Sequence, residues 1–219
     1  MITIDLLTLE ILKNRFPLSR LKFIAQRIDE KDHDAAFNEA VKYIHKFDLY
    51  AIEKIQIFKH LNLDKEQKLD ILDIGTGLAL FPWLCKQYGH DCIFTDIDPH
   101  TIWRQSYSLG RIQSKFYPLE IVAYRDFELP REFDIITSHR TVFDEHNYRW
   151  HADEWKWFLA NAVRYLKDSG RVFIKTNLSE YPPYKPHPSV RKLFEPYTVN
   201  EGFNSLTFEI KKTDIKDII

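Results

Sequence analysis

The chain is poor in cysteine and glycine, and neither sign of charge is in excess. Its 219 residues include 2 Cys and 6 Gly, and 31 Lys and Arg stand against 32 Asp and Glu. Cys85 and Cys92 form no CxxC pair and match no Cys/His ligand spacing. The cysteine content argues against a disulfide-stabilised secreted domain and a cysteine-based metal site. Both cysteines are predicted to be buried free thiols in a reducing compartment.

Long hydrophobic runs and basic segments are also lacking. No run approaches the 18 apolar residues of a transmembrane helix, and the N-terminal stretch is interrupted by Asp5 and Glu10 and has no basic leader. We therefore expect a cytoplasmic protein with no membrane partner. The net charge of −1 shows no basic excess, which counts against tRNA, rRNA or DNA as the substrate.

Residues 1–67 contain no glycine and no strand-like run, and their pattern predicts helices. Lys and Arg balance Asp and Glu in this segment, so it is predicted to be a solvated, amphipathic layer. It precedes the first predicted strand and would serve as a packing layer or as a lid. Apolar residues recur at helical spacing in two places: Phe37, Ala40, Val41 and Ile44, and then Ile52, Ile55, Phe58 and Leu61.

From residue 68 onward, strand-like and helical patterns alternate, which predicts a parallel sheet with right-handed crossovers. The sequence shows no internal repeat and no further domain boundary, so 68–219 is predicted to be a single unit. The proline-rich stretch 178–188 is predicted to be a stiff loop. The predicted strands are 70–74, 92–95, 119–124, 133–138, 171–175 and 205–211, the last paired antiparallel near 197–199, and the predicted helices are 81–88, 101–109 and 155–166.

The most informative segment is 69–77, LDILDIGTG, where an apolar strand carries an acid and then breaks into a turn with two glycines. Such a strand, followed by a helix, lets the backbone approach a nucleoside-like ligand with no Cβ in the way. Asp73 adds a negative charge that could hold a cationic ligand. Ligands of parallel sheets bind at the carboxyl ends of the strands, near the point where strand order reverses.

Two further acids follow predicted strands at the spacing that such a ligand requires. Asp96 ends the second predicted strand, about 20 residues past the glycine turn, where a carboxylate accepts hydrogen bonds from both hydroxyls of a ribose. Asp126 follows the third predicted strand, where an adenine amino group needs an acceptor. As alternatives, Asp96 could cap a helix and Asp126 could be an ordinary loop acid.

These motifs, with FDIITSH at 133–139 and LKDSGRVFI at 166–174, resemble the motif series of the class I S-adenosylmethionine-dependent methyltransferases. The segments GLALFPWLCKQYGHD and DEWKWFL resemble a little-characterised bacterial subgroup associated with surface-polysaccharide and other glycan pathways. The resemblance covers 68–175 well. It implies a Rossmann-like α/β fold with a mostly parallel seven-stranded sheet, helices on both faces and an N-terminal helical layer.

The resemblance also implies the cofactor, S-adenosylmethionine, and the product, S-adenosylhomocysteine, with no metal. Two positions depart from the usual pattern: Ala79 stands where many relatives have a third glycine, and Asp168–Ser169 replaces Pro-Gly. A dinucleotide-binding enzyme is disfavoured because its G-x-G-x-x-G fingerprint needs glycine at position 80, where this chain has leucine. The implied cofactor-binding residues are Asp73, Gly75, Thr76, Gly77, Asp96, Ile97, Asp126, Phe127 and Ser138.

The predicted activity is O-methylation of a small hydroxylated acceptor, such as a sugar or glycan precursor. The methyl group is already activated by the sulfonium, so the protein has to place an acceptor in line with it and exclude water. His139 and His146 are the candidate general bases, and the loop 139–151 is the candidate acceptor site. His139 could instead be a buried structural histidine. The alternatives are a nucleic-acid or protein methyltransferase, and a cofactor-binding protein without turnover.

Overall fold

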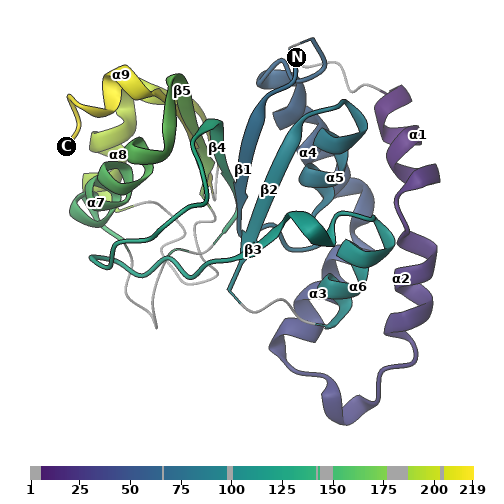
Figure 1. The fold of residues 1–219 in the computed structure, drawn as a ribbon. Coiled ribbons are helices and arrows are strands. Elements are labelled where there is room, and N and C mark those ends of the chain that lie inside the picture. The colour runs from purple at the N-terminus through teal and green to yellow at the C-terminus, as the bar shows by residue number, and fades with distance from the viewer. Residues whose placement is uncertain are drawn as a thin grey trace. The chain divides into compact units, whose positions relative to one another are not determined.

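The computed structural model describes residues 6–65, 67–97, 101–141, 143, 150–176, 187–202 and 205–219. By their contacts, the residues form two compact units (Figure 1). Unit 1 is Met1–Lys68 with Thr76–Pro118, and unit 2 is Leu69–Gly75 with Leu119–Ile219. The limits of these units differ from the predicted segments 1–67 and 68–219.

Unit 1 contains the N-terminal helices and two neighbouring parallel strands. The helices predicted around 37–44, 52–61, 81–88 and 101–109 are all present. The elements are α1 (Leu6–Arg15), α2 (Leu18–Ala25), the 3₁₀ turn η1 (Glu30–Asp32), α3 (Ala35–His45), α4 (Phe47–His60), α5 (Leu80–Gln87), β2 (Asp91–Asp96), α6 (Thr101–Leu109), η2 (Gln113–Lys115) and β3 (Phe116–Pro118).

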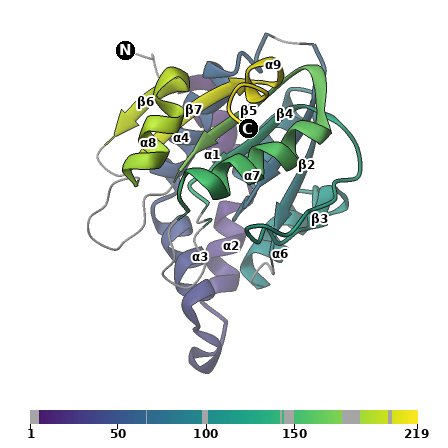
Figure 2. The ribbon, with the colours of Figure 1, turned by 90° about the vertical axis from the view of Figure 1, so that its left-hand side faces the viewer.

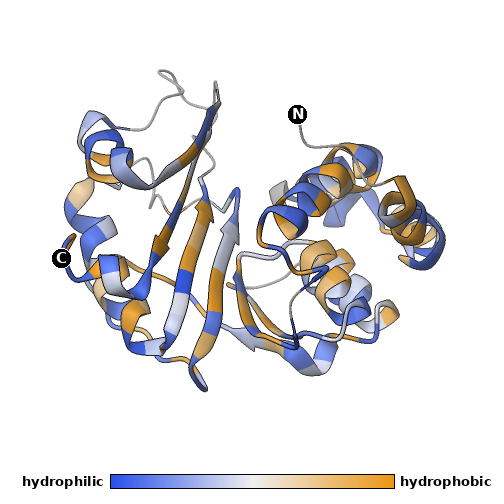
Figure 3. Ribbon diagram, turned by 90° about the horizontal axis from the view of Figure 1, so that it is seen from above, coloured by the Kyte–Doolittle hydropathy of each residue, from blue (hydrophilic) through white to orange (hydrophobic). Residues whose placement is uncertain are grey.

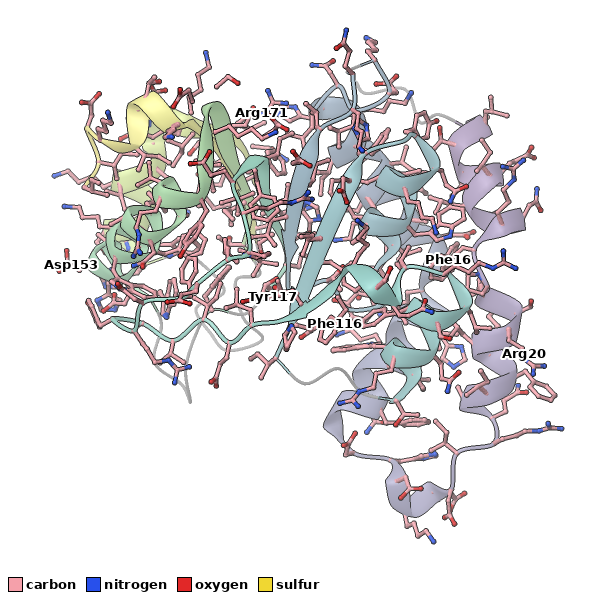
Figure 4. All side chains as sticks on the ribbon, in the orientation of Figure 1. Phe16, Arg20, Phe116, Tyr117, Asp153 and Arg171 are labelled. Atoms are coloured by element: carbon pink, nitrogen blue, oxygen red, sulfur yellow. The ribbon has the colours of Figure 1, made fainter. Side chains whose placement is uncertain are left out.

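The core of unit 1 is largely aromatic. Phe94 of β2 lies 4.9 Å from Tyr107 of α6 and 6.0 Å from Phe116 of β3, measured between ring centroids. Figure 4 shows Phe116 and Tyr117 on β3, and Phe16 between α1 and α2. Both cysteines are buried free thiols, as predicted. No helix in the described part of the chain is long and apolar enough to cross a membrane.

Unit 2 contains five strands and the remaining helices. Across the whole sheet the strand order is β3-β2-β1-β4-β5-β7-β6, which is the seven-stranded order of class I methyltransferases and confirms the predicted fold. The elements are β1 (Asp70–Ile74), β4 (Phe133–His139), α7 (Ala152–Ala162), η3 (Val163–Tyr165), β5 (Leu166–Lys175), α8 (Pro188–Phe194), η4 (Glu195–Tyr197), β6 (Thr198–Gly202), β7 (Ser205–Lys211) and α9 (Lys212–Ile215).

Strand β4 lies between β1 and β5 and runs parallel to both (Figure 1). The register places Asp73 opposite Thr137 and Ile74 opposite Ser138. Strand β7 runs antiparallel to β5 and β6, so the last strand pairs as predicted. The strand order reverses at β1 and β4, so their carboxyl ends are where this architecture binds ligands.

Helices α7 and α8 lie against the strands of unit 2 (Figure 2). Aromatic side chains form this contact. Phe194 of α8 stacks on Phe208 of β7 at 3.8 Å, and Trp155 of α7 contacts both rings edge-on. The strands carry long apolar stretches, whereas the helices mix polar and apolar residues (Figure 3). Trp155 of α7 is buried in this core.

The prediction of the third strand was wrong. Residues 119–124 form no strand, and β3 is the short segment Phe116–Pro118, parallel to β2. The aromatic ring of Phe116 packs on Phe94 and Tyr107, which selects this segment for the sheet. Pro118 lacks the N–H needed to continue the ladder, and Tyr124 has a left-handed φ of 61°.

The boundary between α7 and β5 also differs from the prediction. The helix ends at Ala162 and β5 begins at Leu166, so the predicted turn at 167–170 lies inside the strand. There it forms an irregularity, because Phe133 pairs with Leu166 whereas Ile135 pairs with Arg171. A Cβ on Gly170 would lie 2.8 Å from the carbonyl oxygen of Lys167, so this bulge requires glycine.

A charged cluster connects the amino ends of β1, β4 and β5. The Lys167 ammonium donates to Asp70 at 2.7 Å and to Asp134 at 2.8 Å. Arg131 adds a second cation, 3.1 Å from Asp70. The hydrogen bonds to Asp134 and then to Asp70 raise the pKa of Lys167 above its usual 10.5. One cation therefore neutralises acids from two neighbouring strands.

The substitution Lys167→Met should destabilise the fold by about 1–2 kcal/mol at neutral pH, because it leaves two carboxylates with one remaining cation. Because the pKa of Lys167 is higher in the folded than in the unfolded state, its ion pairs stabilise the fold fully below the unfolded pKa. This stabilisation is lost as pH rises through the folded pKa. The difference between wild type and variant should therefore shrink above pH 10.5. Urea unfolding at neutral and alkaline pH measures this, with exposed Lys216→Met as the control. An equal loss in both variants would contradict the cluster's role.

Candidate functional site

The turn after β1 has three residues in the left-handed region of backbone conformation. Gly75, Gly77 and Ala79 have φ of 68°, 57° and 58°. Glycine adopts this conformation without strain, whereas a residue with a Cβ costs about 1 kcal/mol or more. Ala79 directly precedes α5 and has the left-handed backbone that favours glycine. It stands at the position where the resembling methyltransferases often have a third glycine.

The end of β4 holds this turn from one face. The hydroxyls of Ser138 and Thr141 lie 2.7 Å apart, and both lie within hydrogen-bond distance of the carbonyl oxygen of Ile74, at 3.0 and 2.9 Å. A Cβ on Gly75 would meet the Thr141 hydroxyl oxygen at 2.2 Å. Thr141 therefore occupies the space that a side chain at position 75 needs.

The other face of β4 holds Asp73. Thr137 and His139 are two residues apart on the strand, so their side chains point to the same face. The Thr137 hydroxyl donates to Asp73 Oδ1 at 3.0 Å, and His139 Nδ1 lies 3.5 Å from the same oxygen. Both the Asp73 and His139 side chains are buried, the latter 2% exposed. The acid of the glycine motif is thus an internal group held by its neighbouring strand.

In unit 1, the second half of the turn and the end of β2 form a group of hydrogen bonds. The Gly77 N–H donates to Asp96 Oδ2 at 3.2 Å, and the Ile97 N–H donates to Oδ1 at 3.0 Å. Tyr107 donates its hydroxyl to the carbonyl oxygen of Gly77 at 2.8 Å. The Asp96 carboxylate is therefore oriented by backbone donors at the end of β2.

Gly77 and Ile97 leave room and apolar surface beside Asp96. No atom lies within 4 Å of the position that a Cβ of Gly77 would take. Ile97, directly after β2, is 64% exposed and presents an apolar side chain at the surface. Thr76 completes the turn, because its N–H donates to the carbonyl oxygen of Thr95 at 3.1 Å. These contacts join the turn to the end of β2.

Asp126, Phe127 and Ser138 make contacts within unit 2. Asp126 is 72% exposed and lies 3.2 Å from Arg164 Nη1, as an exposed ion pair. Phe127 is buried, with its ring against Trp157, Phe158 and Tyr165. Ser138 is buried and uses its hydroxyl on the β1 turn. These contacts give all three residues a structural role, and their contact with a cofactor stays a prediction.

The candidate bases lie in or next to the loop that leaves β4. His146 lies outside the described residues, as does most of the loop 139–151. His139 lies beside Asp73, and its buried ring packs edge-on against Phe173 at 6.2 Å. The described loop residues Phe143 and Trp150 are buried against α7. Aromatic contacts with α7 therefore anchor these two residues.

Sequence reasoning missed Thr137 and Thr141 as residues that shape the site. The signal for Thr137 was the two-residue period of β4, which places it on the face of His139. No local signal marks Thr141, because its contact with Gly75 joins residues far apart in the chain. Among the described residues, no group of three His, Cys, Asp or Glu could hold a metal ion, and the expected absence of a metal stays a prediction.

Comparison with known proteins places the fold among the methyltransferases. No family model and no curated protein matches the sequence. Among solved structures, an O-methyltransferase family 2 protein from Planctomyces limnophilus, in complex with apigenin, superposes with a TM-score of 0.51 at 11% identity, covering 85% of this chain and 62% of that one. The chain therefore has the class I methyltransferase fold, and the resemblance seen in the sequence is confirmed at the level of the fold.

Two other structures are similar over a smaller part of their length. Streptomyces venezuelae DesVI gives a TM-score of 0.48 at 18% identity, covering 65% of this chain and 57% of that one. The Thermus thermophilus 16S rRNA N2 G1207 methyltransferase, in complex with AdoMet and guanosine, gives 0.47 at 16%, covering 74% and 42%. The chain thus spans only about half the length of these two proteins.

The Gly75–Thr141 contact predicts a pair of substitutions whose effects depend on each other. Both Gly75→Ala and Gly77→Ala place a Cβ at a positive φ, which adds about 1 kcal/mol of backbone strain. Gly75→Ala should destabilise the protein more, because only its Cβ meets Thr141. Thr141→Ala removes the two nearest atoms, Oγ1 and Cγ2, and leaves Cβ at 2.9 Å, so it should recover part of the Gly75→Ala loss, about 1 kcal/mol. A double-mutant cycle by urea unfolding measures the coupling. Additive effects would show that Thr141 does not restrict position 75.

Proposed function

We propose that this protein is an S-adenosylmethionine-dependent methyltransferase that methylates a hydroxyl group of a small acceptor, such as a sugar or glycan precursor. One observation carries the proposal: the acid-bearing strand β1 ends in a left-handed glycine turn beside the polar end of β4. This is the point of the sheet where strand order reverses. Side chains from the two faces of β4 contact the Asp73 carboxylate and the Ile74 carbonyl oxygen just before that turn.

The residues around the turn fit an adenosine-containing cofactor. Asp96 would accept from the two ribose hydroxyls, because backbone N–H groups orient its carboxylate at the end of β2 and one carboxylate can accept from both hydroxyls. The exposed Ile97 side chain would lie against the adenine ring, which explains its exposure. Gly77, with no atom near its Cβ position, would let the ligand approach the backbone. Asp126 stays the proposed acceptor for the adenine amino group.

When bound, S-adenosylmethionine supplies an activated methyl group on a positively charged sulfur. The chain then has to orient the acceptor hydroxyl, exclude water and remove its proton. Asp73 supplies a fixed negative charge beneath the turn. His146 remains the proposed base in the acceptor loop. The buried ring of His139 favours a role through Asp73 over direct contact with the acceptor.

A polar acceptor fits the side chains at the start of α7 and α8 in unit 2. His151 stacks on His187 with ring centroids 3.9 Å apart. His187 Nδ1 accepts from the Ser189 N–H at 3.3 Å, and Tyr124 donates to the buried Glu154 at 2.6 Å. Helices α7 and α8 follow the loops that leave the carboxyl ends of β4 and β5. Such hydrogen-bonding groups suit a polyhydroxylated or anionic molecule, which needs partners when water leaves.

A nucleic-acid methyltransferase is the second candidate, and one feature of unit 1 favours it. The guanidinium carbons of Arg20 on α2 and of Arg27 just after it lie 5.1 and 3.7 Å from the ring centre of the partly exposed Phe23. Arg20 lies at the exposed surface of that helix (Figure 4). Cations with an aromatic ring are typical of single-strand recognition. The remaining alternatives are a protein methyltransferase and a binding protein without turnover.

The cofactor assignment predicts a loss of affinity in Asp96→Ala. Removing charge-assisted hydrogen bonds to the ribose should cost about 1.5–3 kcal/mol, which is roughly 10- to 150-fold in Kd. Calorimetric titration with S-adenosylhomocysteine measures this, and the exposed Asp29→Ala serves as a matched control. If Asp96→Ala bound as tightly as wild type, Asp96 would be removed from the site.

The activity itself predicts release of S-adenosylhomocysteine in the presence of the correct acceptor. The purified protein should release it with members of a pool of sugars and nucleotide-linked sugars, and not with phenols, amines or RNA. Turnover with RNA alone, lost in an Arg20→Ala/Arg27→Ala variant, would favour the second candidate. Cofactor binding with no turnover across all pools would favour a binding protein.

A further inference from the structure

Two side-chain hydroxyls of α6 contact the second half of the glycine turn, residues 76–79. The Tyr107 hydroxyl donates to the carbonyl oxygen of Gly77, and the Ser106 hydroxyl donates to that of Leu78, both at 2.8 Å. Ser106 and Tyr107 are buried, and all four residues belong to unit 1. Two neighbouring residues of one helix therefore hold two successive carbonyl groups of the turn.

The other carbonyl groups of this half-turn are bonded within the backbone. The Thr76 carbonyl oxygen accepts from the Ala79 N–H at 3.1 Å, and the Ala79 carbonyl oxygen accepts from the Trp83 N–H at 3.0 Å. A backbone carbonyl that is withdrawn from water needs a hydrogen-bond partner. The hydroxyls on α6 supply that partner for Gly77 and Leu78, so each carbonyl of residues 76–79 is held in place.

Gly77 connects the α6 contact with the proposed ribose acceptor. Its N–H donates to Asp96 Oδ2 at 3.2 Å, and its carbonyl oxygen accepts from Tyr107. The two planar peptide groups that meet at Gly77 are thus each held by a side chain, which fixes its left-handed backbone with φ of 57°. Because glycine has wide conformational freedom, loss of the Tyr107 hydroxyl would let Gly77 turn its N–H away from Asp96.

We propose that Ser106 and Tyr107 are positioning residues that hold the glycine turn in the conformation that binds the cofactor. This inference rests on the proposed function. The two residues act through the carbonyl groups of Gly77 and Leu78 and not by contact with the ligand. A turn that is ordered before the ligand arrives lowers the entropy cost of binding. Through Gly77, the Tyr107 hydroxyl also steadies the Asp96 carboxylate.

Conservative variants that remove only a hydroxyl test the proposal. Tyr107→Phe keeps the ring that packs on Phe94 and Phe116. Calorimetric titration should show that its Kd for S-adenosylhomocysteine is raised about two- to tenfold, which corresponds to the loss of one hydrogen bond between neutral groups. Ser106→Ala should raise the Kd by a similar factor.

Two matched variants control for the loss of a hydroxyl from unit 1. Ser108→Ala removes an exposed hydroxyl from the same helix, and Tyr88→Phe removes one that lies 3.3 Å from the Thr8 hydroxyl. Both should bind S-adenosylhomocysteine as tightly as wild type. Urea unfolding of each variant separates affinity from stability. If Tyr107→Phe and Ser106→Ala lowered the stability and left the Kd unchanged, the two residues would be purely structural and the proposal would be overturned.

A double-mutant cycle tests the connection between Tyr107 and Asp96. Tyr107→Phe should raise the Kd by a smaller factor in an Asp96→Ala background than in wild type, because part of its effect passes through the Asp96 carboxylate. Equal factors in both backgrounds would overturn the action of Tyr107 through Asp96.

Hydrogen exchange of the Gly77 amide tests the positioning role without a ligand. This amide should exchange faster in Tyr107→Phe than in wild type or in Tyr88→Phe, because the turn is less tightly held. Unchanged exchange in Tyr107→Phe would overturn the proposal. If wild-type protein did not bind S-adenosylhomocysteine, the proposed function would fail and the exchange rates would still test the role of Tyr107, so the two failures are distinguishable.

Discussion

The arrangement of unit 2 depends on one constraint: the backbone at the end of β1 is held by side chains from the end of β4. Thr137 and His139 contact Asp73 from one face of the strand, and the Ser138 and Thr141 hydroxyls contact the Ile74 carbonyl from the other. Strand side chains alternate between faces. Four residues of the segment 137–141 therefore contact the end of β1 from two sides. These contacts hold the end of β1 directly before Gly75.

Strand β1 carries an acid near each end, and the side chains that contact these two acids differ in kind. Asp70, at the amino end, pairs with Lys167 and Arg131, which stay cationic across the physiological range. Asp73, at the carboxyl end, lies beside a histidine. The amino end of the strand is thus held by exposed and half-exposed cations, whereas its carboxyl end is a buried polar contact.

Much of the fold could be predicted from the sequence, and the errors have physical causes. The β1, β4 and β7 patterns were recognised because each is a run of apolar residues with the period of a strand. The third strand was misplaced because Ile121 and Val122 look more strand-like than Phe116–Pro118, yet the core contact with Phe94 selects the latter. Lys167–Gly170 reads as a turn and forms a bulge inside β5, because strand pairing continues on both sides of it.

By itself, the sequence determined the class of fold, the glycine turn and the acids that follow the first two strands, because these depend on local pattern and spacing along the chain. The tertiary structure alone decided that Asp73 and His139 are neighbours, that Ser138 is a structural hydroxyl, and that Thr141 covers Gly75. Each of these contacts joins residues about 64 to 66 positions apart. Such contacts arise from strand pairing and side-chain packing, which no local pattern in a single sequence specifies.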